Sequence, residues 1–272
     1  MSKPLVFKYG GNAMVDETIQ STILEIICRI KQNGRDVVIV HGGGPFIKET
    51  LQNEQIDSTF IDGQRVTSAE TLSVVERTLK GQVNSQLVEI INKHGQKAVG
   101  LSGKDGKIAI ARKRFGNEGS EQHPEPIDLG FVGDIDHINT DLLGLLLSHG
   151  YIPVITCLAS DENGVTYNIN ADVFAGHIAG ALQAKEFLLL TDVDGLLEDV
   201  NDKNSLIRTI SINEIPDLVE REIIKGGMIP KLEACTTALK KGATQVRILN
   251  GTNPDQLLAL LRNESVGTVV TC

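Results

Sequence analysis

The sequence contains no tryptophan, and aromatic residues make up only 4% of its 272 positions. Its four cysteines are scattered and form no Cys-x-x-Cys pair; they are Cys28, Cys157, Cys235 and Cys272. Cysteines in this pattern favour buried small side chains over disulfides or a metal site. A signal-peptide pattern and an apolar run of about 18 residues, the length of a membrane span, are also missing. We therefore expect a cytoplasmic protein without a membrane partner.

Positive charge is in short supply. The chain has 26 Lys and Arg against 35 Asp and Glu, which gives a net charge of −9. An acidic surface repels the phosphates of nucleic acids, so we expect no nucleic-acid partner. A local basic groove for a small anionic substrate is compatible with this balance. The length and the hydrophobic fraction of 41% suffice for one large domain or two lobes packed together.

Two apolar runs end in glycines. Leu5–Phe7 leads through Lys8 into the glycine pair 10–11, and residues 36–40 lead into His41 and the glycine run 42–44. A glycine turn before a helix exposes backbone N–H groups, and the helix dipole adds positive charge there. We therefore expect anion binding at both turns, with Lys8 adding a full charge at the first. The alternative is a pair of ordinary turns and a solvated lysine.

Apolar runs alternate with helical patterns along the whole chain. Runs such as 36–40, 151–155 and 186–190 are typical of strands covered on both faces of a parallel sheet. The pattern predicts an α/β fold with a mainly parallel sheet and ligands at the carboxyl ends of its strands. Two separate helices are expected at 68–80 and 84–93.

The segment 98–126 is expected to behave differently from the rest. Strands at 98–101 and 108–111 flank a Gly-Lys-Asp-Gly sequence, which predicts a hairpin. The charged, aperiodic residues 112–126 predict a loop.

Common nucleotide-binding signatures are missing. There is no G-x-x-x-x-G-K-[ST] sequence, and Ile47 stands where the third glycine of G-x-G-x-x-G would fall. A Walker-type NTPase and a Rossmann dehydrogenase are therefore disfavoured. The sequence Asp-Val-Asp-Gly at 192–195 hints at a calcium loop, but the remaining EF-hand spacing is absent.

Six motifs follow one another in the order found in the amino acid kinase family, which the sequence resembles over essentially its whole length. They are Lys8-x-Gly10-Gly11, His41-Gly42-Gly43-Gly44, Arg65-Val66-Thr67, Asn168-x-Asn170-Ala171-Asp172, Thr191-Asp192-Val193-x-Gly195 and Gly227-Met228-x-x-Lys231. The resemblance implies a three-layer αβα sandwich with a mainly parallel central sheet. It also implies ATP-dependent phosphorylation. The motifs look most like those of members that phosphorylate the side-chain carboxylate of N-acetyl-L-glutamate in arginine biosynthesis, giving N-acetylglutamyl 5-phosphate.

The chemistry of that reaction explains the residue types. A carboxylate nucleophile is already ionised near neutral pH, so it needs no general base. The difficulty is to bring it against the γ-phosphoryl group of ATP, and catalysis is therefore positioning plus charge neutralisation. By resemblance, Lys8 and Lys231 flank the transferred group, Lys8 on the γ-phosphate side and Lys231 on the nucleotide side, and Asp172 holds both ammonium groups. Without that context, Asp172 would be an acid in the first turn of a helix.

The remaining site residues are also implied by the resemblance. For the acceptor they are Gly43, Gly44, Arg65, Asn168 and Asn170, and for the phosphoryl group Gly10 and Gly11. Arg65 would clamp the α-carboxylate, because a guanidinium matches its two oxygens. The two asparagines could equally form turns.

A nucleotide site is implied in the second half of the chain. Its residues are Thr191, Asp192, Val193, Asp194, Gly195, Leu196, Leu197, Ile223, Ile224 and Lys225. Mg²⁺ is implied because it screens the ATP phosphates. We expect phosphate oxygens and water to hold it, with no site formed by protein alone. His41 is expected to be structural.

The resemblance divides the chain near residue 175. Residues 1–175 would bind the acceptor and form the dimer, and residues 176–272 would bind ATP. Arginine-inhibited members resemble one another in an extra N-terminal helix that links dimers into a hexamer. The first strand here begins at about Pro4, so we expect a homodimer through the helix at 68–80. The alternatives are a kinase for another acceptor, such as LysW-linked aminoadipate or glutamate, and a non-catalytic sensor.

Overall fold

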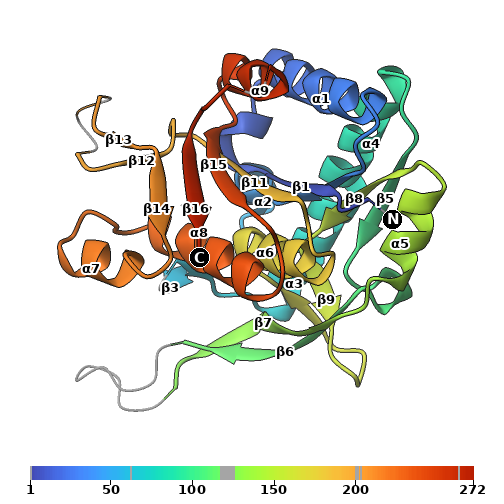
Figure 1. Ribbon diagram of the computed structural model, residues 1–272. Coiled ribbons are helices and arrows are strands. Elements are labelled where there is room, and N and C mark those ends of the chain that lie inside the picture. The colour runs from blue at the N-terminus through green and yellow to red at the C-terminus, as the bar shows by residue number, and fades with distance from the viewer. Residues whose placement is uncertain (1, 62, 117–125, 200–201, 203, 263) are drawn as a thin grey trace.

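An eight-stranded sheet forms the centre of the computed structural model (Figure 1), which describes residues 2–61, 63–116, 126–199, 202, 204–262 and 264–272. From one edge to the other its strands are β14 Thr209–Ser211, β16 Thr268–Thr271, β15 Val246–Asn250, β11 Glu186–Thr191, β1 Leu5–Tyr9, β2 Val37–His41, β8 Ile152–Thr156 and β5 Ala98–Ser102. Neighbouring strands are parallel except β15 and β16. The predicted mainly parallel sheet is confirmed.

Helices cover both faces of this sheet. Their bounds are α1 Glu17–Gln32, α2 Gly44–Asn53, α3 Ala69–Glu76, α4 Asn84–Lys93, α5 Asp141–Ser148, α6 Ala171–Ala181, α7 Ile215–Glu220, α8 Met228–Lys240 and α9 Pro254–Leu261. The helices α1, α4 and α9 pack on one face, and α6 and α8 pack on the other (Figure 1). Successive residues of a strand point to opposite faces, so Phe7 packs with α1 and Val6 with the other layer. The three-layer αβα sandwich is therefore confirmed.

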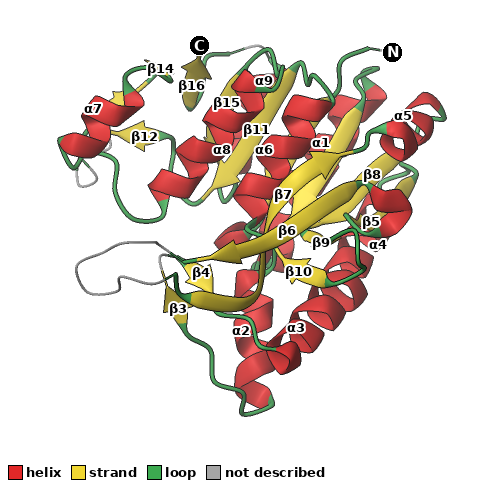
Figure 2. Ribbon diagram, turned by 90° about the horizontal axis from the view of Figure 1, so that it is seen from below, coloured by secondary structure: helices red, strands yellow, loops and turns green. Residues whose placement is uncertain are grey.

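A small closed barrel lies beside the carboxyl ends of the N-terminal strands (Figure 2). It consists of β6 Ala109–Phe115, β7 Asp128–Ile138, β9 Leu158–Ser160 and β10 Thr166–Asn168. Two short antiparallel pairs complete the sheet inventory: β3 Phe60–Ile61 with β4 Gln64–Arg65, and β12 Leu196–Leu197 with β13 Leu206–Ile207. The strand β4 lies against β7, which brings Arg65 toward the barrel.

The expected hairpin at 98–111 is wrong. The strand β5 is the edge of the central sheet, whereas β6 pairs with β7 in the barrel, and a 3₁₀ turn at Asp105–Lys107 separates the two. Gly103 allows this turn because a Cβ there would lie 2.5 Å from the backbone oxygen of Leu158. The predicted loop at 112–126 begins only after Phe115, where β6 ends, and residues 117–125 lie outside the described residues.

The two helices expected at 68–80 and 84–93 are one helical rod. A π-helical segment at Arg77–Val83 joins α3 directly to α4. Gly81 lies inside this segment and does not interrupt it, because every residue around it keeps helical backbone geometry. The widened turn matters for the site, since its side chains face the second glycine loop.

The close approach of α6 and α8 depends on Gly176. A Cβ at this position would lie 2.5 Å from the backbone oxygen of Ala234 in α8. We expect Gly176→Ala to force the helices apart and to lower the free energy of unfolding by about 1–3 kcal/mol. Urea unfolding measures the change.

A matched control is Gly81→Ala, which adds the same methyl group to a helical glycine that has open space around it. We expect its unfolding midpoint to be unchanged or slightly higher, because alanine favours helix. Equal destabilisation of both variants would contradict the packing argument.

Candidate functional site

A buried ion triad lies where three elements of the central layers meet. Lys8 is the penultimate residue of β1, and Asp172 and Lys231 lie in the first turns of α6 and α8. The Lys8 Nζ is 2.8 Å from Asp172 Oδ1, and the Lys231 Nζ is 3.1 Å from Asp172 Oδ2. The side chains of Lys8 and Asp172 are 8% exposed and that of Lys231 is 21% exposed. One carboxylate therefore holds two ammonium groups side by side.

The charges of the triad determine the protonation state of Asp172. Burial by itself would raise the pKa of this carboxyl, but the ammonium groups of Lys8 and Lys231 hold it below its ordinary value. The carboxylate is therefore ionised at neutral pH. Two positive charges against one negative charge leave the triad with a net positive charge, which an anionic ligand would complete.

The two glycine loops approach each other next to Lys8. A Cβ on Gly10 would lie 3.4 Å from both the Gly42 nitrogen and the Lys8 Nζ. The Gly42 N–H donates to the Tyr9 carbonyl oxygen at 3.2 Å, which ties the second loop to the end of β1. Gly11 has a φ of +69°, a backbone conformation that favours glycine. The structure thus brings Gly10 of the first loop and Gly42 of the second loop together beside Lys8.

The second loop also packs against the helical rod. A Cβ on Gly43 would lie 2.6 Å from Leu79 Cδ2 in the π-helical segment, whereas Gly44 has open space around it. Gly43 and Gly44 form the N-terminus of α2, which no side chain caps. Among the described residues, no hydrogen-bond acceptor faces the N–H of either glycine. Such unpaired donors at a helix N-terminus suit an anion.

Arg65 is held at the edge of the barrel as a buried cation. Its Nη1 contacts the Ser58 hydroxyl, and its guanidinium lies 4.6 Å from the centre of the Phe60 ring. Desolvation lowers the pKa of this guanidinium. No carboxylate of the described residues pairs with it, so its charge remains available for an acidic ligand.

The predicted asparagines take different positions. The Asn168 Nδ2 lies 3.3 Å from the Thr67 hydroxyl, which itself donates to the Arg65 carbonyl oxygen at 2.7 Å. Asn168 is thereby connected to the segment of Arg65. The Asn170 Oδ1 instead accepts from the backbone N–H groups of residues 172 and 173, so it caps α6 and places Asp172 in the first turn.

The predicted nucleotide residues gather around a cavity of about 460 Å³. Of those residues, its lining contains Val193, Gly195, Leu196, Leu197, Ile223 and Lys225. Gly195 has a φ of +148°, and a Cβ there would lie 2.6 Å from the Thr268 hydroxyl. The close approach of this loop to Thr268, the first residue of β16, therefore requires glycine at this position.

Four of the predicted nucleotide residues are not in that lining. Thr191 and Asp192 lie at the end of β11, where their side chains bond each other, and Ile224 is buried. The Asp194 carboxylate accepts hydrogen bonds from the side chains of Asn250 at 2.8 Å and Gln256 at 2.9 Å. These bonds stabilise the loop that follows β11.

Sequence reasoning also missed part of the cavity. The further lining residues are Glu198, Asp199, Arg221, Glu222 and Met228. Met228 belongs to the Gly-Met-x-x-Lys motif, so its place in the cavity lining could have been predicted from that motif. The other four lie in irregular or short segments without a periodic pattern.

Two kinds of feature are absent from the described part of the chain. No three His, Cys, Asp or Glu side chains gather there as a metal site. No helix among these residues is long and apolar enough to cross a membrane.

The sequence is similar to that of known proteins over most of its length. The model of the amino acid kinase family matches residues 3–250. An acetylglutamate kinase of Methanococcus aeolicus is 44% identical over 268 residues, 98% of this chain and 91% of that protein. An acetylglutamate kinase of Archaeoglobus fulgidus is 43% identical over 270 residues, 99% of this chain and 93% of that protein.

A solved structure is similar over the whole chain. The crystal structure of smu.665 from Streptococcus mutans UA159 superimposes with a TM-score of 0.80 at 28% identity, and the match covers 100% of this chain and 99% of that one.

The lowered pKa of Asp172 predicts a pH-dependent contribution to stability. A depressed carboxyl pKa stabilises the fold above the ordinary value of about 4, and this contribution is lost as the pH falls through the lower folded-state value. We expect Asp172→Asn to be less stable than the wild type at neutral pH, because two ammonium groups lose their counter-ion. Urea unfolding should show this difference shrinking below about pH 4.

The exposed Asp136 on β7 supplies a control, since no ion pair involves it among the described residues. The free energy of unfolding of Asp136→Asn should equal that of the wild type at every pH. A constant gap between wild type and Asp172→Asn down to about pH 2 would contradict the assigned role.

Proposed function

The chain belongs to the amino acid kinase family and is a kinase, and on that premise we propose that it phosphorylates the side-chain carboxylate of N-acetyl-L-glutamate with ATP. The relatives named acetylglutamate kinase, at 43–44% identity over nearly the full length, support this choice of acceptor. The product would be N-acetylglutamyl 5-phosphate. The reaction would be a step of arginine biosynthesis in the cytoplasm.

The observation that carries the mechanism is the pairing of Lys8 and Lys231 on one buried carboxylate. Transfer of a phosphoryl group between two oxygens spreads negative charge over the transferred group and its neighbours. Two ammonium groups held a few ångströms apart would stabilise that charge without moving, because Asp172 has already oriented them. The in-line reaction then needs no protein nucleophile and no general base.

The glycine loops would supply the remaining donors. The unpaired N–H groups of Gly43 and Gly44 would bind the reacting carboxylate, and Gly10 and Gly11 would face the phosphoryl group. Arg65 would bind the α-carboxylate through its buried guanidinium, with Asn168 beside it. Both ends of a dicarboxylate would thereby be neutralised.

ATP would enter from the side of the triad that lies opposite the acceptor. Residues 1–175 would form the acceptor lobe and residues 176–272 the nucleotide lobe, whose cavity lies between the 193–199 segment and the residues before α8. Mg²⁺ would screen the phosphates while held mainly by phosphate oxygens and water. We further propose a homodimer that uses the helical rod at 69–93.

The charge-neutralising role predicts the effect of removing either lysine. Lys8→Ala and Lys231→Ala should each lower kcat by about 10²–10³, the scale for one preorganised donor. Acyl phosphate trapped by hydroxylamine, with ATP, Mg²⁺ and N-acetyl-L-glutamate supplied, measures the rate.

Lys240→Ala is the control, since Lys240 ends the same helix as Lys231 and is exposed. Its kcat should stay within about twofold of the wild type. Wild-type turnover in either site variant would refute the mechanism.

If Arg65 binds the α-carboxylate, a substitution of Arg65 should weaken binding of the acceptor and leave ATP binding unchanged. Arg65→Lys keeps the charge but loses the two-point geometry, so the KM for N-acetyl-L-glutamate should rise by about 10- to 100-fold. The KM for ATP should not change.

Arg112→Lys, at an exposed position on β6, makes the same exchange away from the site. Both KM values should match those of the wild type. An Arg65→Lys enzyme that loses ATP affinity instead would move Arg65 out of the acceptor site.

A further inference from the structure

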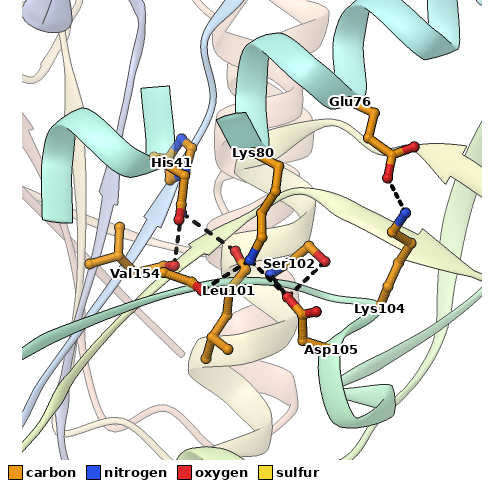
Figure 3. A network of polar contacts seen from close by, with 10 residues as sticks. His41, Glu76, Lys80, Leu101, Ser102, Lys104, Asp105 and Val154 are labelled. Carbon is orange, nitrogen blue, oxygen red and sulfur yellow. Dashed lines mark hydrogen bonds and ion pairs between the residues drawn. The ribbon is translucent and has the colours of Figure 1, made fainter. Parts of the chain in front are cut away.

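The second glycine loop is oriented by a histidine that has no exposed surface, and Figure 3 shows the polar network around it. His41 is the last residue of β2, directly before the loop. Its Nδ1 lies 2.9 Å from the Gly42 carbonyl oxygen. A carbonyl oxygen only accepts, so this contact requires a proton on Nδ1.

The other ring nitrogen is bound by Asn84. The Asn84 Nδ2 lies 2.8 Å from the His41 Nε2 and 2.9 Å from the Val154 carbonyl oxygen. The Val154 oxygen can only accept, so the amide nitrogen, and not the amide oxygen, faces this point. Asn84 therefore donates to Nε2, which must carry no proton. Two partners with fixed roles specify a neutral imidazole protonated on Nδ1.

The tautomer fixes the direction of a backbone donor. In a trans peptide the carbonyl and the following N–H point in opposite directions. The imidazole holds the carbonyl oxygen of Gly42, so it also aims the N–H of Gly43 away from His41. The Gly43 N–H has no acceptor among the described residues. Under the proposed function it would donate to the reacting carboxylate of the substrate.

The surroundings of Asn84 make it a rigid support. Asn84 is 2% exposed and begins α4 directly after the π-helical segment. Lys80 of that segment bonds the Gly100 carbonyl oxygen and the Asp105 carboxylate, each at 2.9 Å, which anchors the rod to β5 and the turn after it (Figure 3). A Cβ on Gly100 would lie 2.1 Å from the Asn84 Oδ1, so the Asn84 amide fills the space that the absent side chain of Gly100 leaves on β5. Wide helical turns of this kind recur at functional sites.

We propose that Asn84 is a positioning residue for phosphoryl transfer, which holds His41 in the tautomer that aims the Gly43 N–H at the reacting groups. This role rests on the proposed function. Asn84 touches no substrate atom in this account and acts only through His41 and the loop.

The first test compares turnover in variants of the network. Asn84→Ala should lower kcat for acyl-phosphate formation by about 10- to 100-fold, the scale for groups that orient a functional residue from behind. The dissociation constant of ATP should not change, because the nucleotide cavity lies in the other lobe. His41→Asn keeps a short N–H donor beside Gly42 and should retain more activity than His41→Leu.

Asn92→Ala is the matched control. Asn92 lies two turns further along the same helix, and its Oδ1 accepts from the Ala98 N–H at 2.9 Å without reaching the loop. Its kcat should stay within about twofold of the wild type. A folded Asn84→Ala enzyme with wild-type kcat, or an equal loss in Asn92→Ala, would overturn the proposal.

The second test observes the unmodified chain, and a variant serves only to assign the signal. NMR of the ¹⁵N-histidine-labelled wild type should show a neutral histidine signal with the proton on Nδ1 that is missing in His41→Asn. A proton on Nε2 of His41 would overturn the proposal. A wild type that forms no acyl phosphate would overturn the proposed function and the role of Asn84 with it, whereas an active Asn84→Ala overturns only the latter.

Discussion

The site depends on one electrostatic constraint: a buried aspartate that must be ionised and must be shared by two lysines. Lys8 cannot be buried at the end of β1 without a counter-ion, and Asp172 supplies it from the neighbouring layer. Lys231 approaches the same carboxylate only because α6 and α8 pack closely at Gly176. Fold and site are therefore coupled, since the packing of two helices sets the distance between two charges.

This arrangement stores positive charge at a defined place before any ligand binds. Under the proposed function, ligands of negative charge would meet three groups: a surplus ammonium group, the N–H groups at the start of α2 and the Arg65 guanidinium. The last two have no acidic partner among the described residues. Their fixed positions reduce the reorganisation that accompanies charge transfer in water. We propose that an acidic protein can bind anions in this way because two of its cations, Lys8 and Arg65, are buried.

Much of this was predictable from local sequence. The β-branched runs identified the buried strands, and the glycines after them located both loops, because these signals depend on neighbouring residues only. The pairing of β6 with β7, which replaced the expected hairpin, was not predictable, since it depends on contacts between distant segments. The same holds for the π-helical join, which packs against β5 and the glycine loop. The cap that Asn170 forms on α6 is instead a local contact with residues 172 and 173, and the resemblance, not the local sequence, placed Asn170 among the acceptor residues. Arg221 and Glu222 line the cavity proposed for the nucleotide from a turn without periodicity.

We propose that the chain activates a carboxylate by neutralising charge around it, with N-acetyl-L-glutamate as the acceptor. Hydroxamate formation from ATP should be compared for N-acetyl-L-glutamate, glutamate, aspartate and α-aminoadipate under identical conditions. We expect hydroxamate with N-acetyl-L-glutamate alone. A signal with a different acceptor would keep the lysines and contradict the assigned substrate. The absence of any signal, despite ATP binding, would contradict catalysis itself and indicate a sensor with the same fold.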